Sequence, residues 1–257
     1  MKKFLFADLD DTLFQTFGKC GSFGAFADDV DALEPAAYYK DGSVCSYTTR
    51  AQRSFLALLQ DGMTVIPTTA RDLDGLRRVS LPFTSYAVIN YGGVVLEPGG
   101  AVDQPWLDGM RTAMHAALPG LQALSTHLDE HCTRTGYGGR PRMIEDFATP
   151  FFLVVKDPGK QHDRLATLEE EVVRPWIADG NRDYFIHRNG NNLAILPNAL
   201  NKANAVAHIT ARLRAEHGEI VTFGMGDSRS DARFMAACDY AIIPRGTQLA
   251  GLTVGAL

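Results

Sequence analysis

The segment Phe4-Leu5-Phe6-Ala7-Asp8-Leu9-Asp10-Asp11-Thr12 is an apolar run that ends in carboxylates. A short buried strand of this kind places its acids at the carboxyl edge of a sheet, where open α/β folds hold their ligands. Side chains two residues apart on an extended chain point the same way, so Asp8 and Asp10 are expected to converge. Converging carboxylates need a shared proton or cation, and Mg²⁺ prefers such oxygen ligands. The segment therefore predicts a magnesium site, and the alternative is a solvated acidic turn that caps a helix.

Size and charge bound the class of protein. The chain has 257 residues, of which 46% are hydrophobic, so it can bury one substantial core and a smaller second one. Its net charge of -5 argues against a general nucleic-acid-binding surface, and no nucleic-acid partner is expected. An acidic chain that handles phosphate must therefore concentrate positive charge at one place.

The cysteines and the N-terminus indicate the compartment. The four cysteines form no C-x-x-C motif and no His/Cys cluster with zinc spacing, which favours reduced thiols: Cys20, Cys45, Cys132 and Cys238. The apolar run after Met1-Lys2-Lys3 is too short for a signal peptide, and no stretch approaches the roughly 20 apolar residues of a membrane span. We therefore expect a cytoplasmic protein with no membrane partner.

Strand-like runs alternate with helical ones along most of the chain, which is typical of a parallel sheet. Between about 104 and 189 the rhythm changes to helix, strand, helix, strand, which indicates an inserted α+β domain. The predicted fold class is α/β, with a doubly wound, mainly parallel Rossmann-like core sheet. The core is expected at 1–103 and 190–257, and the inserted domain at 104–189.

Local signals place the smaller elements. An Asp-Gly pair predicts a hairpin over 38–44, and Gly-rich turns frame a second hairpin around 94–96. Inside the inserted domain we expect two helical stretches, a Gly-rich turn at 136–139, strands at 151–155 and 184–187, and a helix at 162–176.

Two further strand ends carry groups that suit a phosphate. Thr69 follows a buried strand and precedes a helix, where a hydroxyl and free backbone N–H groups favour an anion. Its alternative role is a helix cap in the pattern Thr69-x-x-Asp72. Lys202 opens a helix, where its charge opposes the helix dipole, so a nearby anion would explain it. Its alternative role is an ordinary surface lysine.

A last strand end adds two acids. Asp227 follows a Gly-Met-Gly turn, and Asp231 lies one helical turn further on the same face. For Asp231 a capping box with Ser228 is a strong alternative. For Asp227 the glycines favour a close approach of the backbone to a ligand.

The ordered set DxDxT, Thr, Lys and GDxxxD, each at a strand end, resembles the haloacid-dehalogenase-like (HAD) phosphotransferase superfamily. The match covers nearly the whole chain. The insertion between the second and third motifs is similar to the large α/β cap of the Cof-like branch (subfamily IIB), which includes sucrose-phosphate, trehalose-phosphate and mannosyl-phosphoglycerate phosphatases.

The resemblance implies a function and a role for each motif residue. It implies an Mg²⁺-dependent phosphomonoester hydrolase of a small phosphorylated metabolite, with a sugar phosphate favoured. Asp8 would be the nucleophile that forms an aspartyl-phosphate, and Asp10 the general acid and base. Thr69 and Lys202 would bind the phosphoryl oxygens. The metal ligands would be Asp8, Asp10 through its backbone carbonyl, Asp227 and Asp231.

The chain departs from the Cof-like pattern in two places. Ser228 and Ser230 stand where the fourth motif usually has Gly and Asn, which puts one support of the metal site in doubt. The segment 14–48 is longer than usual and would cover the substrate entrance, form a partner surface or be a tolerated insertion. Candidate substrate contacts are Asn90, Arg134, Arg140, Arg142, Glu145, Lys156, Arg188, Asn191 and Asn192.

Two other functions remain open at this point, and a third is disfavoured. A phosphosugar mutase of the phosphomannomutase type shares the cap and motifs, and would need a site for two phosphates. A phosphosugar-binding or regulatory protein could use the same fold, although a protein without catalytic activity would have no need to keep the converging carboxylates. A receiver-like signalling domain has no place for the insertion. The oligomeric state is not predicted.

Overall fold

The computed structural model describes residues 1–23 and 31–256 of the chain. It divides into two compact units, one formed by Met1–Gln104 with Asn201–Leu257 and the other by Pro105–Leu200. No helix among the described residues has both the length and the apolar character needed to cross a membrane.

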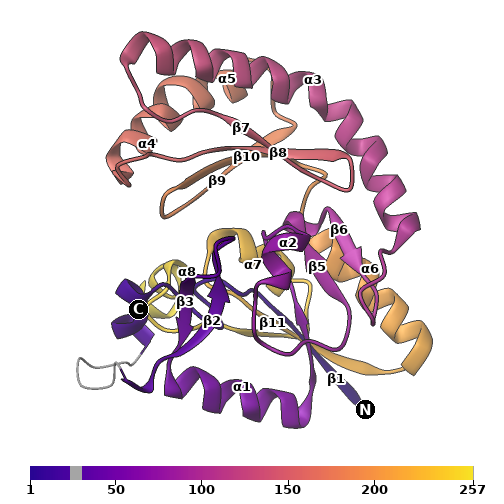
Figure 1. The fold of residues 1–257 in the computed structure, drawn as a ribbon. Coiled ribbons are helices and arrows are strands. Elements are labelled where there is room, and N and C mark those ends of the chain that lie inside the picture. The colour runs from indigo at the N-terminus through magenta and orange to yellow at the C-terminus, as the bar shows by residue number, and fades with distance from the viewer. Residues whose placement is uncertain (24–30, 257) are drawn as a thin grey trace. The chain divides into compact units, whose positions relative to one another are not determined.

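The first unit is built on a parallel sheet (Figure 1). Its strand order is β12-β11-β1-β4, and all three pairings are parallel. The strands are β1 (Lys2–Ala7), β4 (Thr64–Pro67), β11 (Ile220–Met225) and β12 (Tyr240–Ile242). The first apolar run of the sequence is the buried half of β1, which lies between two neighbours. The predicted α/β class with a parallel core sheet is therefore confirmed.

The predicted hairpin around 94–96 extends this sheet. Strands β5 (Ala87–Ile89) and β6 (Val94–Leu96) pair antiparallel, and the turn between them is the 3-10 segment η3 (Asn90–Gly92). A parallel bridge joins Thr68 to Val88, and the Thr69 N–H donates to the Val88 carbonyl at 2.8 Å. The hairpin therefore brings η3 to the carboxyl edge of β4.

Helices follow most of the core strands. They are α1 (Arg50–Gly62), α2 (Leu73–Arg77), α6 (Lys202–His217), α7 (Arg229–Met235), α8 (Gln248–Leu252) and the 3-10 turn η5 (Val254–Ala256). Thr49 caps α1 in a reciprocal capping box with Gln52. Helices α2 and α7 follow β4 and β11 directly, so they begin near the edge of the sheet where Thr69 and Asp227 lie.

The segment 14–48 contributes to this core. It contains η1 (Phe17–Phe23) and the hairpin of β2 (Glu34–Tyr38) and β3 (Val44–Thr48), which confirms the hairpin predicted over 38–44. Ala36 and Ala37 are fully buried and pack in the same hydrophobic cluster as Leu5 and Leu59. Positions 24–30 lie outside the described residues, so the proposed roles of this segment stay predictions.

The second unit is an antiparallel sheet packed on helices. The strand order is β7-β8-β10-β9, with β7 (Arg142–Asp146), β8 (Thr149–Val155), β9 (Tyr184–Asn189) and β10 (Asn192–Pro197). The helical elements are α3 (Gln104–Thr135), α4 (His162–Leu168), the π-helical segment η4 (Glu169–Val173) and α5 (Arg174–Ala178). An inserted α+β unit was expected, but its second boundary is wrong. β10 pairs with β8 and β9, so 190–200 belong to this unit and not to the core.

One continuous helix replaces the two helical stretches expected after 104. Pro119 lies inside α3, where proline removes a backbone donor and disfavours the preceding turn. Gly120 leaves room for Tyr184, whose hydroxyl donates to the Ala117 carbonyl at 2.6 Å. Apolar residues on both sides of Pro119 are buried, so packing and this hydrogen bond stabilise the helix across it.

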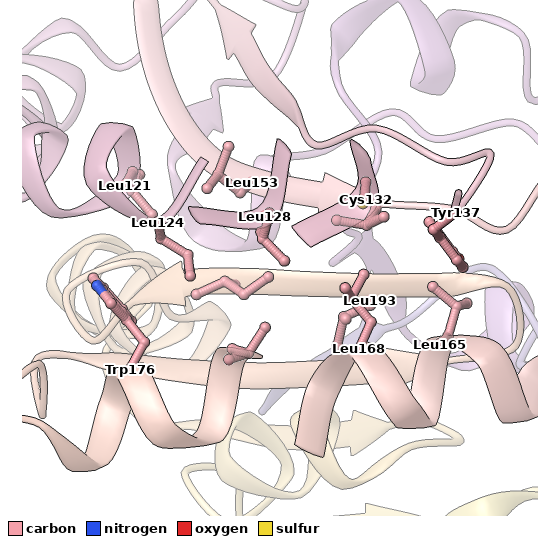
Figure 2. Close-up of a cluster of buried hydrophobic side chains, with 13 residues drawn as sticks. Leu121, Leu124, Leu128, Cys132, Tyr137, Leu153, Leu165, Leu168, Trp176 and Leu193 are labelled. Carbon is pink, nitrogen blue, oxygen red and sulfur yellow. The ribbon is translucent and has the colours of Figure 1, made fainter. Parts of the chain in front are cut away.

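A single hydrophobic cluster joins the helices of the second unit to one face of its sheet (Figure 2). The face includes Leu153 and Val155 of β8 and Leu193 and Ile195 of β10, which alternate along their strands as one buried face requires. The cluster is Leu121, Leu124, Leu128, Cys132, Tyr137, Leu153, Val155, Leu165, Leu168, Val173, Trp176, Leu193 and Ile195. All of these residues lie within Pro105–Leu200, so this unit has a core of its own.

The chain passes between the units at two points, and both are bound to α6. Just before the first passage, the buried Asp103 carboxylate lies 2.7 Å from His208 Nε2 and accepts from Arg212 Nη1 at 2.6 Å. Just after the second, Asn201 caps α6, because its side chain accepts from the Ala203 N–H at 2.8 Å.

Candidate active site

Three parallel strands deliver polar residues to one edge of the core sheet. Asp8 follows β1, Thr69 follows β4 and Asp227 follows β11. The Asp8 N–H donates to the Met225 carbonyl at 2.8 Å, and the Thr68 N–H donates to the Ala7 carbonyl at 2.8 Å. The strand ends are therefore hydrogen-bonded to one another at the point where the site begins.

Lys202 connects two of the acids. Its ammonium donates to Asp8 Oδ1 and to Asp231 Oδ1, both at 2.7 Å, and the side chain is only 4% exposed. Asn201 is the N-cap of α6, which puts Lys202 in the first helical turn. The alternative of an ordinary surface lysine is therefore wrong.

Asp231 has two structural functions at once. Its Oδ2 accepts from the Ser228 hydroxyl at 2.6 Å and from the Ser228 N–H at 3.1 Å, which is the predicted capping box. Its Oδ1 accepts from Lys202. Burial opposes ionisation, but the Lys202 charge and the Ser228 donors outweigh it and hold the pKa of Asp231 below its usual value. Asp231 is therefore a carboxylate.

The other two acids are harder to ionise. Burial raises the pKa of Asp8 to about 7, although Lys202 opposes the shift. Burial, together with the charges of Asp8 and Asp231, raises the pKa of Asp227 to about 9. One buried ammonium therefore does not balance the negative charge that three ionised carboxylates would bring.

These three acids form a set that fits a divalent cation. One oxygen from each of Asp8, Asp227 and Asp231 can be chosen so that all lie within 4.8 Å of one another, and all three residues are buried. Hard carboxylate oxygens around uncompensated negative charge are the ligands that Mg²⁺ prefers. The residues therefore fit the metal that the sequence predicts.

Asp10 lies outside this cluster, which corrects the expectation that it converges with Asp8. Strand β1 ends at Ala7, so the alternation of an extended chain does not extend to Asp10. The Asp10 carboxylate instead accepts from Arg71 Nε and Nη2, both at 2.7 Å.

Arg71 is the main site residue that sequence reasoning missed. The guanidinium lies 5.3 Å from the centre of the Phe14 ring, and Nη1 donates to the Gly75 carbonyl at 3.2 Å. The signal was present, since an arginine two residues after Thr69 leaves the same strand end as the predicted phosphate ligand. Its partner could not be read from the sequence.

Thr69 is fully enclosed but is not a helix cap. Its hydroxyl accepts from the Arg71 N–H at 3.1 Å. The cap of α2 is Asp72, whose carboxylate accepts from the Gly75 N–H at 2.6 Å, so the capping alternative for Thr69 is wrong. The position of Thr69 beside β1 is consistent with the predicted phosphate contact.

Tyr91 is a second residue that the sequence did not reveal. It lies in η3 with a φ of 56°, and its N–H donates to the Thr69 carbonyl at 3.1 Å. Burial raises the pKa of its phenol above the usual value, and the charges of Lys202 and Asp8 act on it as well. Tyr91 therefore stays neutral close to the charged groups of the site.

Several of the candidate substrate contacts in the second unit have partners within it, among them Arg134 with His131 and Arg140 with the Tyr137 carbonyl. Arg188 Nε pairs with Glu169 at 2.8 Å. Asn191 exchanges two hydrogen bonds with the backbone of Asp157, at 3.0 and 2.8 Å. The Arg188 and Asn191 side chains fix loops and helices within the second unit.

No protein-family model matches the sequence, and no curated protein matches it. Solved structures do match. The sucrose-phosphatase of Synechocystis sp. PCC6803, in complex with sucrose and phosphate, aligns with a TM-score of 0.52 and 17% identity over 94% of this chain and 83% of that chain. The C-terminal domain of C. albicans trehalose-6-phosphate phosphatase aligns with a TM-score of 0.57 and 11% identity over 92% and 73%.

A Thermoplasma acidophilum protein aligns with a TM-score of 0.50 and 15% identity over 94% of this chain and 91% of that chain. At such identities the similarity establishes the fold. The chain therefore shares the α/β fold of the Synechocystis sucrose-phosphatase and of the C. albicans trehalose-6-phosphate phosphatase domain.

Proposed function

We propose that this protein is an Mg²⁺-dependent phosphatase that hydrolyses a small phosphorylated metabolite, a sugar phosphate, through an aspartyl-phosphate intermediate. The observation that carries the proposal is the buried Asp8 carboxylate, 2.7 Å from Lys202 and clustered with Asp227 and Asp231 at the edge of a parallel sheet. An oxygen nucleophile, a cation and a set of metal ligands are thus adjacent.

The proposed reaction gives a role to each of these residues. An Asp8 oxygen attacks phosphorus while the bond from phosphorus to the leaving oxygen breaks, and Asp10 gives that oxygen a proton. Asp10 then takes a proton from water, whose oxygen attacks phosphorus and releases Asp8. Lys202 and Thr69 bind phosphoryl oxygens during both steps.

Asp8, Asp227 and Asp231, with the Asp10 backbone carbonyl, would hold Mg²⁺. When bound, the metal supplies the positive charge that lets an anionic carboxylate approach an anionic phosphate. The raised pKa values of Asp8 and Asp227 support this role, because burial and the neighbouring carboxylates make it costly to ionise both residues without a further cation.

The solved structures with this fold support the choice of substrate. One is named a sucrose-phosphatase and was obtained with sucrose and phosphate, and another is a trehalose-6-phosphate phosphatase. We take the second unit, Pro105–Leu200, to be the inserted cap expected from the sequence, and we assign to it the selection of the metabolite.

The test is phosphate release from a panel of sugar phosphates by the purified protein with Mg²⁺. We expect turnover that Asp8→Asn abolishes. Asp11→Asn is the matched control, because Asp11 is close in sequence but pairs with Lys19 at 2.5 Å outside the cluster. A labelled phosphoenzyme should appear with wild type and not with Asp8→Asn. Conversion of a sugar phosphate to its isomer without phosphate release would instead identify a mutase, and tight binding without turnover a binding protein.

A further inference from the structure

Arg71 and Asp10 form a bidentate ion pair at the edge of the site. Nε meets Oδ2 and Nη2 meets Oδ1, both at 2.7 Å. Parallel hydrogen bonds of this type fix the plane of a carboxylate as well as its position. The Asp10 side chain is otherwise 48% exposed and lies just before the turn Asp11–Leu13, and its carboxylate has no other hydrogen-bond partner among the described residues.

Arg71 is itself held on three sides. Nη1 donates to the Gly75 carbonyl at 3.2 Å, and the guanidinium stacks over Phe14. The Arg71 carbonyl accepts from the Asn90 N–H at 2.8 Å, and its own N–H donates to Thr69. Its side chain is only 17% exposed. Arg71 therefore has several partners that fix its position, whereas the Asp10 carboxylate is hydrogen-bonded to Arg71, so we take Arg71 to set the geometry of the pair.

The arrangement leaves Asp10 able to transfer a proton. A carboxyl group has lone pairs for about four hydrogen bonds, and Arg71 uses one on each oxygen. When Asp10 carries a proton, one oxygen can stay on Arg71 while the hydroxyl of the other faces the leaving oxygen.

We propose that Arg71 is a positioning residue that orients Asp10 for acid–base catalysis. The proposal rests on the proposed function, because it takes Asp10 to be the group that protonates the leaving oxygen. Arg71 acts through Asp10 and touches no reacting atom. Its removal therefore matters most when the leaving group needs a proton.

The first test compares two leaving groups in single-turnover experiments with enzyme in excess. The sugar alkoxide needs a proton to leave, whereas p-nitrophenolate does not. Arg71→Gln should slow release from the sugar phosphate on the order of 10- to 100-fold, and release of p-nitrophenolate by less than about threefold. Arg71→Lys should recover only part of the loss, because an ammonium cannot form both bonds. Arg77→Gln, an exposed change in the helix α2 that follows Arg71, is the control and should have no effect. Equal slowing of both esters would overturn the proposal.

The second test is a double-mutant cycle. If Arg71 acts through Asp10, Arg71→Gln should cause no further loss in an Asp10→Asn background. Multiplying losses would overturn the inference and leave the proposed function intact. Where Arg71→Gln fails to fold, Arg71→Lys replaces it in the cycle. If wild type releases no phosphate from any ester, both the function and this inference are wrong. If wild type is active and Asp8→Asn is not, only the Arg71 results decide the inference.

Discussion

Lys202 is the only lysine among the buried residues of the described chain, and it lies among three buried carboxylates. Burying an ammonium is costly unless it is paired, and here two hydrogen bonds of 2.7 Å pair it. Asp8 and Asp231 raise the pKa of Lys202 above its usual value and outweigh its burial, so it remains charged through the range of ordinary assays. The charge on this lysine therefore belongs to the folded structure as well as to the proposed chemistry.

Removing this charge should destabilise the protein. Lys202→Met keeps most of the side-chain volume but leaves Asp8 and Asp231 without their cation. We expect the free energy of unfolding at pH 7 without Mg²⁺ to fall by about 3 kcal/mol, and phosphate release to be lost. Denaturant unfolding measures the first. Lys40→Met is the control, since the ion pair of Lys40 with Asp74, at 3.7 Å, is exposed at the surface and is expected to contribute little to stability. Equal stability of the two variants would contradict this assignment.

The pKa of Asp227 predicts how stability depends on pH. In the unfolded chain an aspartate titrates near 3.9, whereas in the folded protein burial raises the pKa of Asp227 to about 9. Between these values the folded state binds more protons, so the free energy of unfolding falls as pH rises, by up to about 1.4 kcal/mol per pH unit for one proton.

The measurement is denaturant unfolding of metal-free protein from pH 5 to pH 9. Asp227→Asn should flatten the curve, and Mg²⁺ should stabilise wild type more at pH 9 than at pH 5. A stability that rises with pH over this range in wild type, relative to Asp227→Asn, would refute the assigned shift.

The predictable site residues are those that a strand delivers directly. Asp8, Thr69 and Asp227 lie at or just beyond the ends of parallel strands, so their proximity follows from the topology. Asp10 does not, because β1 ends at Ala7 and the Asp10 carboxylate pairs with Arg71. Sequence periodicity carries no information about the path of the chain beyond the end of a strand.

At the scale of elements, the approach of η3 to α6 positions Lys202. Gly92 has a φ of 99°, and a Cβ built there would lie 2.5 Å from the Asn201 carbonyl oxygen and 3.0 Å from the backbone nitrogen of Lys202. A glycine is required here both by the positive φ and by the lack of space for a side chain. The backbone of the turn between β5 and β6 therefore packs directly against the backbone at the start of α6.

Gly92→Ala should displace Lys202. We expect a loss of about 2 kcal/mol in the free energy of unfolding and a fall in phosphate release larger than the loss of folded protein explains. Gly100→Ala is a matched control, because Gly100 has a φ of 88° but nothing within 4 Å of its built Cβ. The control should show the strain alone and keep full activity per folded molecule. If the two variants have the same activity, the contact at Gly92 does not position the lysine.

Elements with a clear apolar pattern were predictable, and the others were not. The core strands and both hairpins follow their sequence signals. β7 was missed because Arg142-Met143-Ile144-Glu145-Asp146 is largely polar and is specified by its pairing with β8. The break expected within α3 is absent because its buried leucines and the Tyr184 hydrogen bond hold the helix through Pro119.

At the scale of the whole molecule, the division into units is set by pairing. β10 lies between β8 and β9 in the antiparallel sheet, although its apolar residues resemble a return strand of the core. Leu193 and Ile195 belong to the hydrophobic cluster of the second unit. A linear sequence does not say which sheet an apolar run of this length will join.

This division predicts which fragment folds. A fragment of residues 105–200 contains the complete sheet and cluster and should unfold cooperatively. A fragment of 105–189 lacks the central strand β10 and should remain unfolded, because β9 then has no neighbour. Circular dichroism and thermal denaturation compare the two. A folded 105–189 fragment would contradict the observed boundary.

The anchoring of both chain passages on α6 has a mechanical consequence. The Asp103 carboxylate contacts His208 and Arg212 of α6. The chain returns from the second unit at Asn201, the N-cap of α6, one residue before Lys202. Both points at which the chain leaves or re-enters the first unit are thus attached to one helix, α6. Lys202, which donates to Asp8, is joined by a single peptide bond to Asn201, so a change in the backbone at Asn201 would act directly on the position of the catalytic cation.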